Sequence, residues 1–382
     1  MPESGQKSGA DENFMARAHR LALGGVNTTH PNPRVGCVLV RDGEVVGEGG
    51  HQYAGEDHAE IIALRHAGKR AAGATAYLTL EPCIHHGRTP PCARELIKAG
   101  IARAVVAMED PNPSVKSGGI AELQHAGISV RVGVGGNRAR ELNRGFCKRM
   151  TKGRPWVTLK MAASLDGKTA MASGESRWIT CEAARRDVHR MRAACSAILT
   201  GAGTVLRDDP AMTARPDGGA NAEDARQPLR VILDGNLSTP PQAKILRPPG
   251  NALVITTAGN DRDAELLRAD NVEVITCRAR AGRIDLRQVM EELAAREINE
   301  LLVEAGPRLA GSMLQLQLVD EIVLYVAPAL LGADASGMFG IDGLETLADA
   351  RALTGISFRD VRRVGADLRI TLEVAPRDSL GE

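Results

Sequence analysis

Residues 57–60 of this chain are DHAE, and residues 81–92 are EPCIHHGRTPPC. His58 and Glu60 open an expected helix, Cys83 follows an expected strand, and Cys92 stands at a second helix start. Two thiolates and a neutral imidazole balance the charge of Zn²⁺ and leave the fourth tetrahedral position to water, as in catalytic zinc sites. A carboxylate that is not a ligand can then carry a proton to a leaving amine. The two segments therefore predict a catalytic zinc site with Glu60 as the proton carrier.

The spacing restricts how such a site is built. Residues two apart in the middle of a helix do not share a face, so His58 and Glu60 must lie in the first helical turn. The two prolines before Cys92 mark another helix start, where the macrodipole favours a thiolate. An alternative remains open for each segment taken alone. In the first, Asp57 and Glu60 form a capping box, and in the second, the cysteines are ordinary core residues.

Turn and periodicity signals outline two α/β domains. A helix is expected over 14–23, then a hairpin around Asp42-Gly43, then alternating helices and strands. This alternation predicts a largely parallel sheet covered on both faces. The polar segment RMTKGRP, residues 149–155, precedes a new strand, WVTLKMA, and a second alternating part. We therefore expect domains at 1–150 and 151–382, with a mobile loop at 215–227 and a closing hairpin around 365–367.

Composition excludes several classes of protein. The chain has 382 residues, of which 43% are hydrophobic and 25% charged, as in a globular protein of two or three domains. A net charge of +1 gives no global field for nucleic acid, and 2% aromatic residues are few for stacking bases. No apolar run approaches the roughly 18 residues of a membrane span. Seven scattered cysteines indicate a reducing compartment, so we expect a cytoplasmic protein without nucleic-acid or membrane partners.

The second part of the chain offers two glycine-rich turns between a strand and a helix, LTGAGT at 199–204 and VEAGP at 303–307. Such turns hold phosphate groups, but the first lacks the full dinucleotide fingerprint because Leu206 occupies the third glycine position. Four arginines around this turn could bind a 2′-phosphate or a sugar phosphate: Arg185, Arg192, Arg207 and Arg215. Two alternatives remain open. The glycine-rich segments can be ordinary tight turns of an α/β sheet, and the arginines can lie on a solvated helix face.

Taken together, the motifs resemble one enzyme family. HAE and EPCIHHGRTPPC are similar to the H-x-E and P-C-x-x-C signature of zinc deaminases, although eight residues rather than two separate Cys83 from Cys92. With this long loop, the run resembles the bacterial bifunctional riboflavin-biosynthesis deaminase-reductases. The resemblance extends from about Phe14 to Val374 through THPNPRVGCVLV, DPNP, LNRGFCKRM, LKMAASLDGKTA, SGESRWIT, LTGAGTVLRDDP, VEAGP and YVAPALLG. It implies an N-terminal cytidine-deaminase-like α/β/α domain and a C-terminal dihydrofolate-reductase-like α/β domain.

The resemblance also implies site residues and cofactors. One catalytic Zn²⁺ is bound by His58, Cys83 and Cys92, Glu60 is the catalytic proton shuttle, and Asn32 contacts the substrate ring. Substrate contacts implied in the second domain are Ser176, Arg192, Met212, Arg215 and Glu304. Contacts implied for NADPH are Ala162, Trp178, Thr204, Asp208 and the turn Gly306, Pro307, Arg308, Leu309, Ala310, Gly311 and Ser312. A simple turn at Asn32 and a core position for Trp178 are the alternatives.

Several further residues have two interpretations. Lys160 and Asp166 flank the end of the first strand of the second domain, where they would polarise a sugar carbonyl or orient a ribose; an exposed ion pair is the alternative. The loop residues His85, His86 and Arg88 either contact a ribose phosphate or are solvated. The other cysteines have no ligand partner at metal spacing and are expected in core or incidental positions: Cys37, Cys147, Cys181, Cys195 and Cys277.

The function implied by the resemblance is two consecutive steps of riboflavin synthesis. The first domain hydrolyses the 2-amino group of 2,5-diamino-6-ribosylamino-4(3H)-pyrimidinone 5′-phosphate. The second uses NADPH to reduce the ribosyl group, giving 5-amino-6-(5-phosphoribitylamino)uracil. A homo-oligomer joined mainly through the reductase domains is also implied. The alternatives are a nucleic-acid base deaminase with an appended domain, a binding protein with structural zinc, and a deaminase whose second domain performs another reduction.

Overall fold

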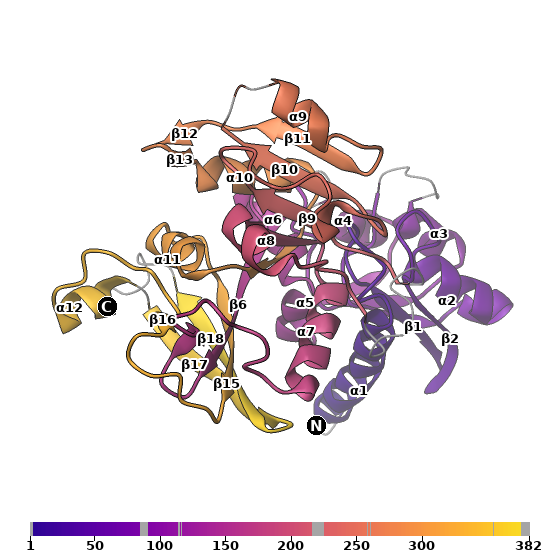
Figure 1. Cartoon of the computed structure of the whole chain (residues 1–382). Helices are drawn as coiled ribbons and strands as arrows, with labels where there is room; N and C mark the ends of the chain where they lie inside the picture. The colour runs from indigo at the N-terminus through magenta and orange to yellow at the C-terminus, as the bar shows by residue number, and fades with distance from the viewer. Residues whose placement is uncertain are drawn as a thin grey trace. The chain divides into compact units, whose positions relative to one another are not determined.

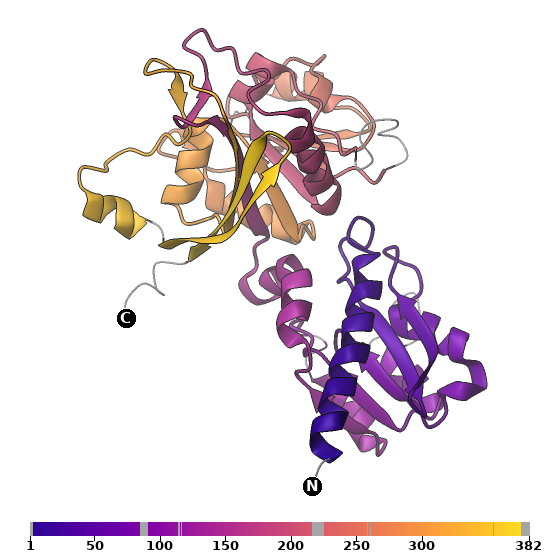
Figure 2. The same cartoon turned by 90° about the horizontal axis from the view of Figure 1, so that it is seen from below.

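The computed structural model of the chain describes residues 3–84, 91–113, 115, 117–215, 225–257, 259, 261–353 and 355–375. It divides into two compact units, Met1–Arg154 and Pro155–Glu382 (Figure 1, Figure 2). The helix Arg144–Lys152 spans the position at which the sequence analysis places the boundary. His85, His86 and Arg88, and most of the loop expected at 215–227, lie outside the described residues. No described helix is long and apolar enough to cross a membrane.

The first unit is built on a mixed sheet with the strand order β2-β1-β3-β4-β5. The pairings of β1 with β2 and β3 are antiparallel, and only β3, β4 and β5 run parallel. The expectation of a largely parallel sheet is therefore wrong for this unit, because β3 pairs antiparallel with β1, which also forms the expected antiparallel hairpin with β2. The elements are α1 (Glu3–Leu23), β1 (Gly36–Arg41), β2 (Glu44–Gly50), α2 (Ala59–Ala67), a 3₁₀ helix (Gly68–Ala71), β3 (Thr75–Leu78), α3 (Cys92–Lys98), β4 (Arg103–Val106), α4 (Gly118–His125), β5 (Ser129–Val132), α5 (Gly136–Leu142) and α6 (Arg144–Lys152).

Glycines let helices approach this sheet closely. A Cβ atom on Gly36 would lie 2.0 Å from the Ala18 carbonyl oxygen of α1, and one on Gly49 would lie 2.4 Å from the Ala59 carbonyl oxygen of α2. Only glycine permits such contacts, which bring the backbones of helix and strand together. The first residue of α2 is therefore fixed against β2, and with it the preceding residue, His58.

A buried carboxylate fixes α1 to the sheet of the same unit. Asp11 is 2% exposed and accepts hydrogen bonds from both outer nitrogens of Arg103, from Arg131 and from the Tyr77 hydroxyl, at 2.7–2.9 Å. The Arg103 hydrogen bonds lower the pKa of Asp11, although burial opposes them. These contacts join the helix to β3, β4 and β5.

We expect Asp11→Asn to lower the free energy of unfolding of the first unit by about 2 kcal/mol, because the charge is removed and an NH₂ group replaces one acceptor oxygen, which leaves two of the four donors without a partner. Calorimetry and hydrogen exchange of the α1 amides would measure this loss. Asp42→Asn is the matched control, because Asp42 is 91% exposed. Equal stability of both variants would contradict the prediction.

The second unit contains a larger sheet with the order β11-β10-β9-β8-β14-β6-β15-β18-β17. Strands from β11 to β15 run parallel, and β18 and β17 form the expected closing hairpin. The elements are β6 (Trp156–Ser164), β7 (Lys168–Ala170), α7 (Glu182–Ala194), β8 (Ala197–Gly201), α8 (Ala202–Asp208), β9 (Leu229–Leu233), a 3₁₀ helix (Lys244–Leu246), β10 (Ala252–Thr256), α9 (Asp261–Leu267), β11 (Val272–Thr276), β12 (Ala279–Arg280), β13 (Arg283–Ile284), α10 (Leu286–Ala295), β14 (Glu300–Glu304), α11 (Pro307–Gln315), β15 (Glu321–Ala327), β16 (Ser336–Gly337), α12 (Leu347–Leu353), β17 (Gly355–Val364) and β18 (Asp367–Ala375). The carboxyl ends of the parallel strands share one edge, where ligands bind in such sheets.

Candidate functional site

Three of the expected metal ligands come together in the first unit. His58 is the N-cap residue of α2, Cys83 follows β3, and Cys92 is the first residue of α3. The Nδ1 atom of His58 lies 3.2 Å from the Cys92 sulfur and 3.7 Å from the Cys83 sulfur. Tetrahedral zinc, with bonds of about 2.3 Å to sulfur and about 2.0 Å to nitrogen, separates such ligands by about 3.5 Å. The side chains therefore fit a zinc ion, and among the described residues they form one potential metal-binding group.

The chemistry of the two thiols also suits a metal. Hydrogen bonding with Cys92 lowers the pKa of Cys83, although burial opposes this effect, and His58 lowers it further. The same contact with Cys83 raises the pKa of Cys92. At neutral pH one thiolate is thus already stabilised, and a thiolate is the form that binds zinc.

The capping-box alternative for this segment is wrong. The Asp57 carboxylate pairs with Arg65 at 2.5 Å, and the N-cap residue is His58, which makes no side-chain cap bond to the described residues. The charge of Arg65 draws the Asp57 side chain away from the helix end. The His58 side chain instead approaches the two cysteines.

Glu60 lies in the first turn of α2, as the spacing requires. The residue is 3% exposed, and its carboxyl group interacts with His58 and both ligand cysteines. Burial raises the pKa of Glu60 to about 7, although the nearby His58 opposes the shift. A carboxyl group with such a pKa can both take up and release a proton near neutral pH.

Asn32 lies beside this cluster through a histidine that the sequence analysis did not single out. The Asn32 amide nitrogen is 3.1 Å from His51 Nε2, and the His51 ring packs edge-on against His58 with centroids 5.3 Å apart. His51 is 2% exposed, and its Nδ1 is 3.1 Å from the Asp57 carbonyl oxygen. No sequence motif points to His51, because the residues it contacts in the site, Asn32 and His58, lie in other segments of the chain.

A second residue missed by the sequence analysis supports the metal loop. Glu81 is 3% exposed, and its carboxylate accepts hydrogen bonds from the backbone nitrogens of Asp110, Ser117 and Ile120 at 2.9–3.1 Å. These bonds tie the residues before Cys83 to the start of α4. Glu81 lies inside the EPC motif, so its position was visible in the sequence but its partners were not.

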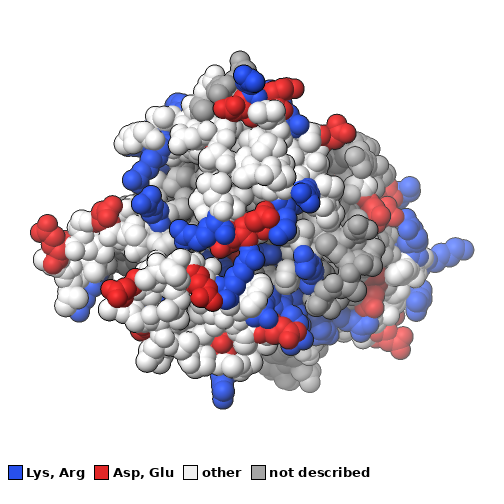
Figure 3. Space-filling model, in the orientation of Figure 1, with Lys and Arg blue, Asp and Glu red and all other residues white. Residues whose placement is uncertain are grey.

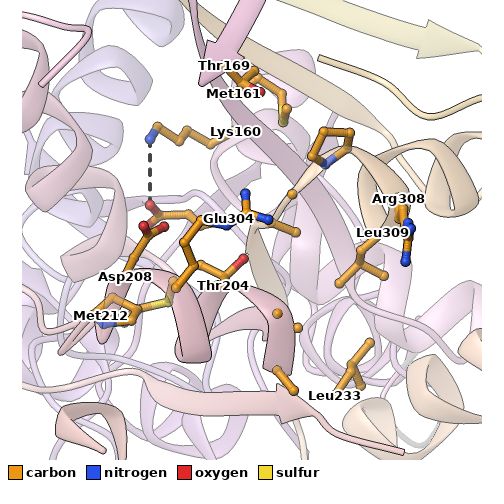
Figure 4. A pocket seen from close by; sticks show the side chains of 18 of the residues that line it. Lys160, Met161, Thr169, Thr204, Asp208, Met212, Leu233, Glu304, Arg308 and Leu309 are labelled. Atoms are coloured by element: carbon orange, nitrogen blue, oxygen red, sulfur yellow. Dashed lines mark ion pairs between the residues drawn. The ribbon is translucent and has the colours of Figure 1, made fainter. Parts of the chain in front are cut away.

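The second unit contains a cavity of about 1550 Å³ at the carboxyl edge of its sheet. Most of the residues expected to contact substrate and NADPH line it (Figure 4). They are Ala162, Ser176, Trp178, Arg192, Thr204, Asp208, Met212, Arg215, Glu304, Gly306, Pro307, Arg308, Leu309 and Ser312. Ala310 and Gly311 are not among the lining residues: Ala310 packs in the core, and a Cβ atom on Gly311 would lie 2.0 Å from the Gly340 carbonyl oxygen.

A charged cluster lies in the part of this cavity beside β6 and β14. The Arg192 guanidinium donates to both Glu304 oxygens at 2.6 and 3.0 Å, and Lys160 Nζ lies 3.7 Å from Glu304 (Figure 4). Burial alone would raise the pKa of Glu304, but Arg192 and Lys160 outweigh it and lower the pKa to about 2. Glu304 is therefore ionised and held between two cations.

The alternative of an exposed Lys160–Asp166 pair is wrong. Asp166 accepts hydrogen bonds from the Ser164 hydroxyl and from the backbone nitrogens of Leu331 and Gly332. Lys160 instead pairs with Glu304, because β14 lies beside β6 in the sheet. The two residues are near in sequence but have separate partners.

Trp178 is 70% exposed, so its core alternative is wrong. The Arg185 guanidinium carbon lies 4.5 Å from the centre of the Trp178 ring. Ser176 Oγ lies 3.4 Å from a carboxylate oxygen of Asp208. This side of the cavity therefore presents an aromatic face and polar groups to a ligand.

The remaining cysteines are free thiols outside the metal group. Cys37, Cys195 and Cys277 are buried, which confirms the expected core positions. Cys147 and Cys181 are partly buried. The described cysteines that approach a metal geometry are Cys83 and Cys92.

Comparison with known proteins finds a matching family for each of the two units. Residues 8–108 match the model of the cytidine and deoxycytidylate deaminase zinc-binding region, and residues 155–369, more than half of the chain, match the RibD C-terminal domain. The riboflavin biosynthesis protein RibD of Escherichia coli is 50% identical over 95% of this chain and 99% of its own length. The chain belongs to the RibD family.

Other members of the RibD family support this assignment. The RibD protein of Haemophilus influenzae is 45% identical over 94% of this chain and 96% of its own length. A structure of Acinetobacter baumannii RibD has a TM-score of 0.89 at 43% identity, covering 97% of this chain and all of that one. A Thermotoga maritima structure described as a diaminohydroxyphosphoribosylaminopyrimidine deaminase and 5-amino-6-(5-phosphoribosylamino)uracil reductase has a TM-score of 0.85 at 32% identity, with coverages of 97% and 100%.

Membership of the RibD family confirms the fold class and the type of activity. The first unit is the zinc-binding deaminase domain, and the second is the NADPH-dependent RibD reductase domain. The chain is thus a bifunctional enzyme of riboflavin biosynthesis, a hydrolase and an oxidoreductase. The alternatives of a nucleic-acid base deaminase and of a binding protein are set aside.

Proposed function

We propose that this enzyme hydrolyses the 2-amino group of 2,5-diamino-6-ribosylamino-4(3H)-pyrimidinone 5′-phosphate and then reduces the ribosyl group to give 5-amino-6-(5-phosphoribitylamino)uracil. The observation that carries this proposal is the pairing of two sites in one chain. One unit holds a zinc-fitting triad beside Glu60, and the other holds a cavity with a buried Lys–Glu–Arg cluster. The substrate in turn carries an amidine-like carbon for the first site and a ribosyl group for the second.

In the deaminase unit, His58, Cys83 and Cys92 would hold the zinc ion. When bound, zinc supplies Lewis acidity that lowers the pKa of water. Glu60 takes a proton from the attacking water and passes it to the leaving amino group, so water is consumed and ammonia is released. Asn32 orients the pyrimidine, because a side-chain amide can both donate and accept hydrogen bonds at the ring edge.

In the reductase unit, cavity residues such as Thr204 and Gly306 would hold NADPH, which would supply a hydride for the ribosyl carbon. Lys160, whose pKa is lowered by burial, polarises the ribosyl oxygen that leaves this carbon as the ring opens. Arg192 and Glu304 hold the sugar hydroxyls. Arg215 is exposed at the cavity, where its guanidinium carries further donors for the substrate phosphate.

Mass spectrometry of the products tests this proposal. Zinc-loaded enzyme is incubated with the diaminopyrimidinone ribosyl phosphate, with and without NADPH. We expect an amino group to be replaced by oxygen in both reactions, and two hydrogens to be added only with NADPH. Survival of the amino group in a protein shown to contain zinc would overturn the substrate assignment.

We also propose that the enzyme is a homo-oligomer joined through its reductase units. β17 is an edge strand of the larger sheet and is exposed along most of its length. It presents Ile356, Phe358 and Val361, which are 47%, 75% and 54% exposed. An edge strand with exposed apolar side chains is an association surface, because its backbone groups and these side chains both lack cover, although β17 also carries charged residues such as Arg362 and Arg363.

We expect Phe358→Glu to weaken association, because burying a carboxylate in an interface is costly. Sedimentation equilibrium over a range of concentrations would show a shift toward the monomer. Leu266→Glu is the matched control, since Leu266 is 64% exposed on α9, away from this edge. Unchanged association of Phe358→Glu would contradict the proposed interface.

A further inference from the structure

One end of the reductase cavity is formed by a small hairpin, β12–β13. Its strands pair through Ala279–Ile284 and Arg280–Arg283, and Ala281 and Gly282 connect them with φ values of 51° and 73°. Two positive φ values are typical of the tight turn that suits a two-residue hairpin. The hairpin and the start of α10 line the cavity from Arg280 to Leu286.

The sheet places this hairpin far from the reacting residues. The carboxyl ends of β10, β9, β8, β14 and β6 follow one another along the cavity, since these neighbouring strands are parallel. Four strand spacings of about 4.8 Å place β10 about 19 Å from β6. Figure 4 shows the same order: Lys160 of β6 lies at one side, Leu233 of β9 at the other, and Glu304 and Thr204 between them.

This order fixes the direction of a bound dinucleotide. Lys160, Glu304 and Arg192 mark the end where the ribosyl group reacts, so the nicotinamide lies there. The turn at Gly306 and the start of α11 lie in the middle, on β14. The adenosine part must then extend toward β9 and β10, where Gly235, Asn236 and Thr257 line the cavity.

Two cations without other partners lie at that adenosine end. Arg280 and Arg283 line the cavity and are exposed, and neither forms an ion pair or a side-chain hydrogen bond with the described residues. Lys and Arg side chains gather on the surface where Figure 1 places this hairpin (Figure 3). Arg192 and Arg185 lie at the other end and have partners, namely Glu304 for the first and Trp178 for the second.

We propose that Arg280 and Arg283 bind the 2′-phosphate of NADPH and so give the reductase its preference over NADH, an inference that rests on the proposed reductase function. The 2′-phosphate is the group that distinguishes the two cofactors, and it lies on the adenosine ribose. A guanidinium binds phosphate oxygens through two parallel N–H groups. The tight hairpin turn holds the two arginines close together at the cavity edge.

Binding of two nucleotide fragments to the full-length, zinc-loaded protein tests this proposal without turnover. 2′,5′-ADP carries the 2′-phosphate and 5′-AMP lacks it, and calorimetry measures the affinity for each. We expect 2′,5′-ADP to bind about tenfold more weakly to Arg280→Ala and to Arg283→Ala, with an unchanged affinity for 5′-AMP. Arg278→Ala is the matched control, because Arg278 bonds Gln288 and does not line the cavity.

Each other outcome is informative. Equal losses for 2′,5′-ADP and 5′-AMP would show that the hairpin only shapes the cavity, and unchanged affinity for 2′,5′-ADP would place its phosphate elsewhere; either overturns the proposal. If the unmodified protein binds both fragments equally, the use of NADPH itself is wrong. That last result separates failure of the proposed function from failure of this assignment.

Discussion

Glu60→Gln is expected to lower the rate of deamination about a thousandfold and to leave the reduction unchanged. Glutamine has nearly the shape of glutamate and keeps hydrogen-bonding atoms near Cys92, but it cannot take up and release a proton. Burial raises the pKa of Glu60 to about 7, so the native group exchanges protons under the conditions of the reaction. Ammonia release measures the first activity, and NADPH oxidation with the deaminated substrate measures the second.

Two controls separate proton transfer from loss of the site. Zinc content must stay at one ion per chain in Glu60→Gln, since the three ligands are untouched. Glu44→Gln, at an exposed position at the start of β2, should retain both activities. A variant that keeps zinc and more than a tenth of the deamination rate would show that another group carries the proton.

Glu304→Gln is expected to abolish reduction and to lower the free energy of unfolding of the second unit by about 3 kcal/mol, because two mostly buried cations lose their counter-ion. The side chains of Lys160, Arg192 and Glu304 are 18%, 15% and 9% exposed. Both tryptophans of the chain, Trp156 and Trp178, belong to this unit. Tryptophan fluorescence in urea therefore reports its unfolding.

The same cluster predicts the direction of a pH effect. The pKa of Glu304 is lowered to about 2 because Arg192 and Lys160 outweigh the effect of burial. A lowered pKa stabilises the folded state above the usual pKa of the group, and this contribution is lost as the pH falls toward 2. The stability difference between the native chain and Glu304→Gln should therefore shrink in that range. Glu291→Gln, at an exposed position on α10, should follow the native profile, and a constant difference for Glu304→Gln would contradict the assignment.

The metal site and the order of the elements were predictable from sequence because their signals are local. His58 and Glu60 lie at one helix start and Cys92 at another, and both starts are marked by neighbouring residues. Alternating helix and strand patterns likewise predicted many of the helices and strands of both units, although α5, α6 and β11 were missed. The capping-box alternative at Asp57 could be decided only from the structure, because the partner of this carboxylate, Arg65, lies two turns further along the helix.

The contacts that join distant segments required the tertiary structure. Glu304 is 112 residues from Arg192 and meets both Arg192 and Lys160 only because β14 lies between β8 and β6. Asn32 reaches His58 through His51, and Asp11 meets Arg103 and Arg131 across the first sheet. Sequence alone determined which residues can bind a metal and where α2 and α3 begin, since ligand chemistry and helix-start signals act over a few residues. The expected start of the first helix at residue 14 was wrong, because the polar residues before it continue the same helix from Glu3. Strand order decided which charges meet, because a parallel sheet brings together residues that no short-range pattern connects.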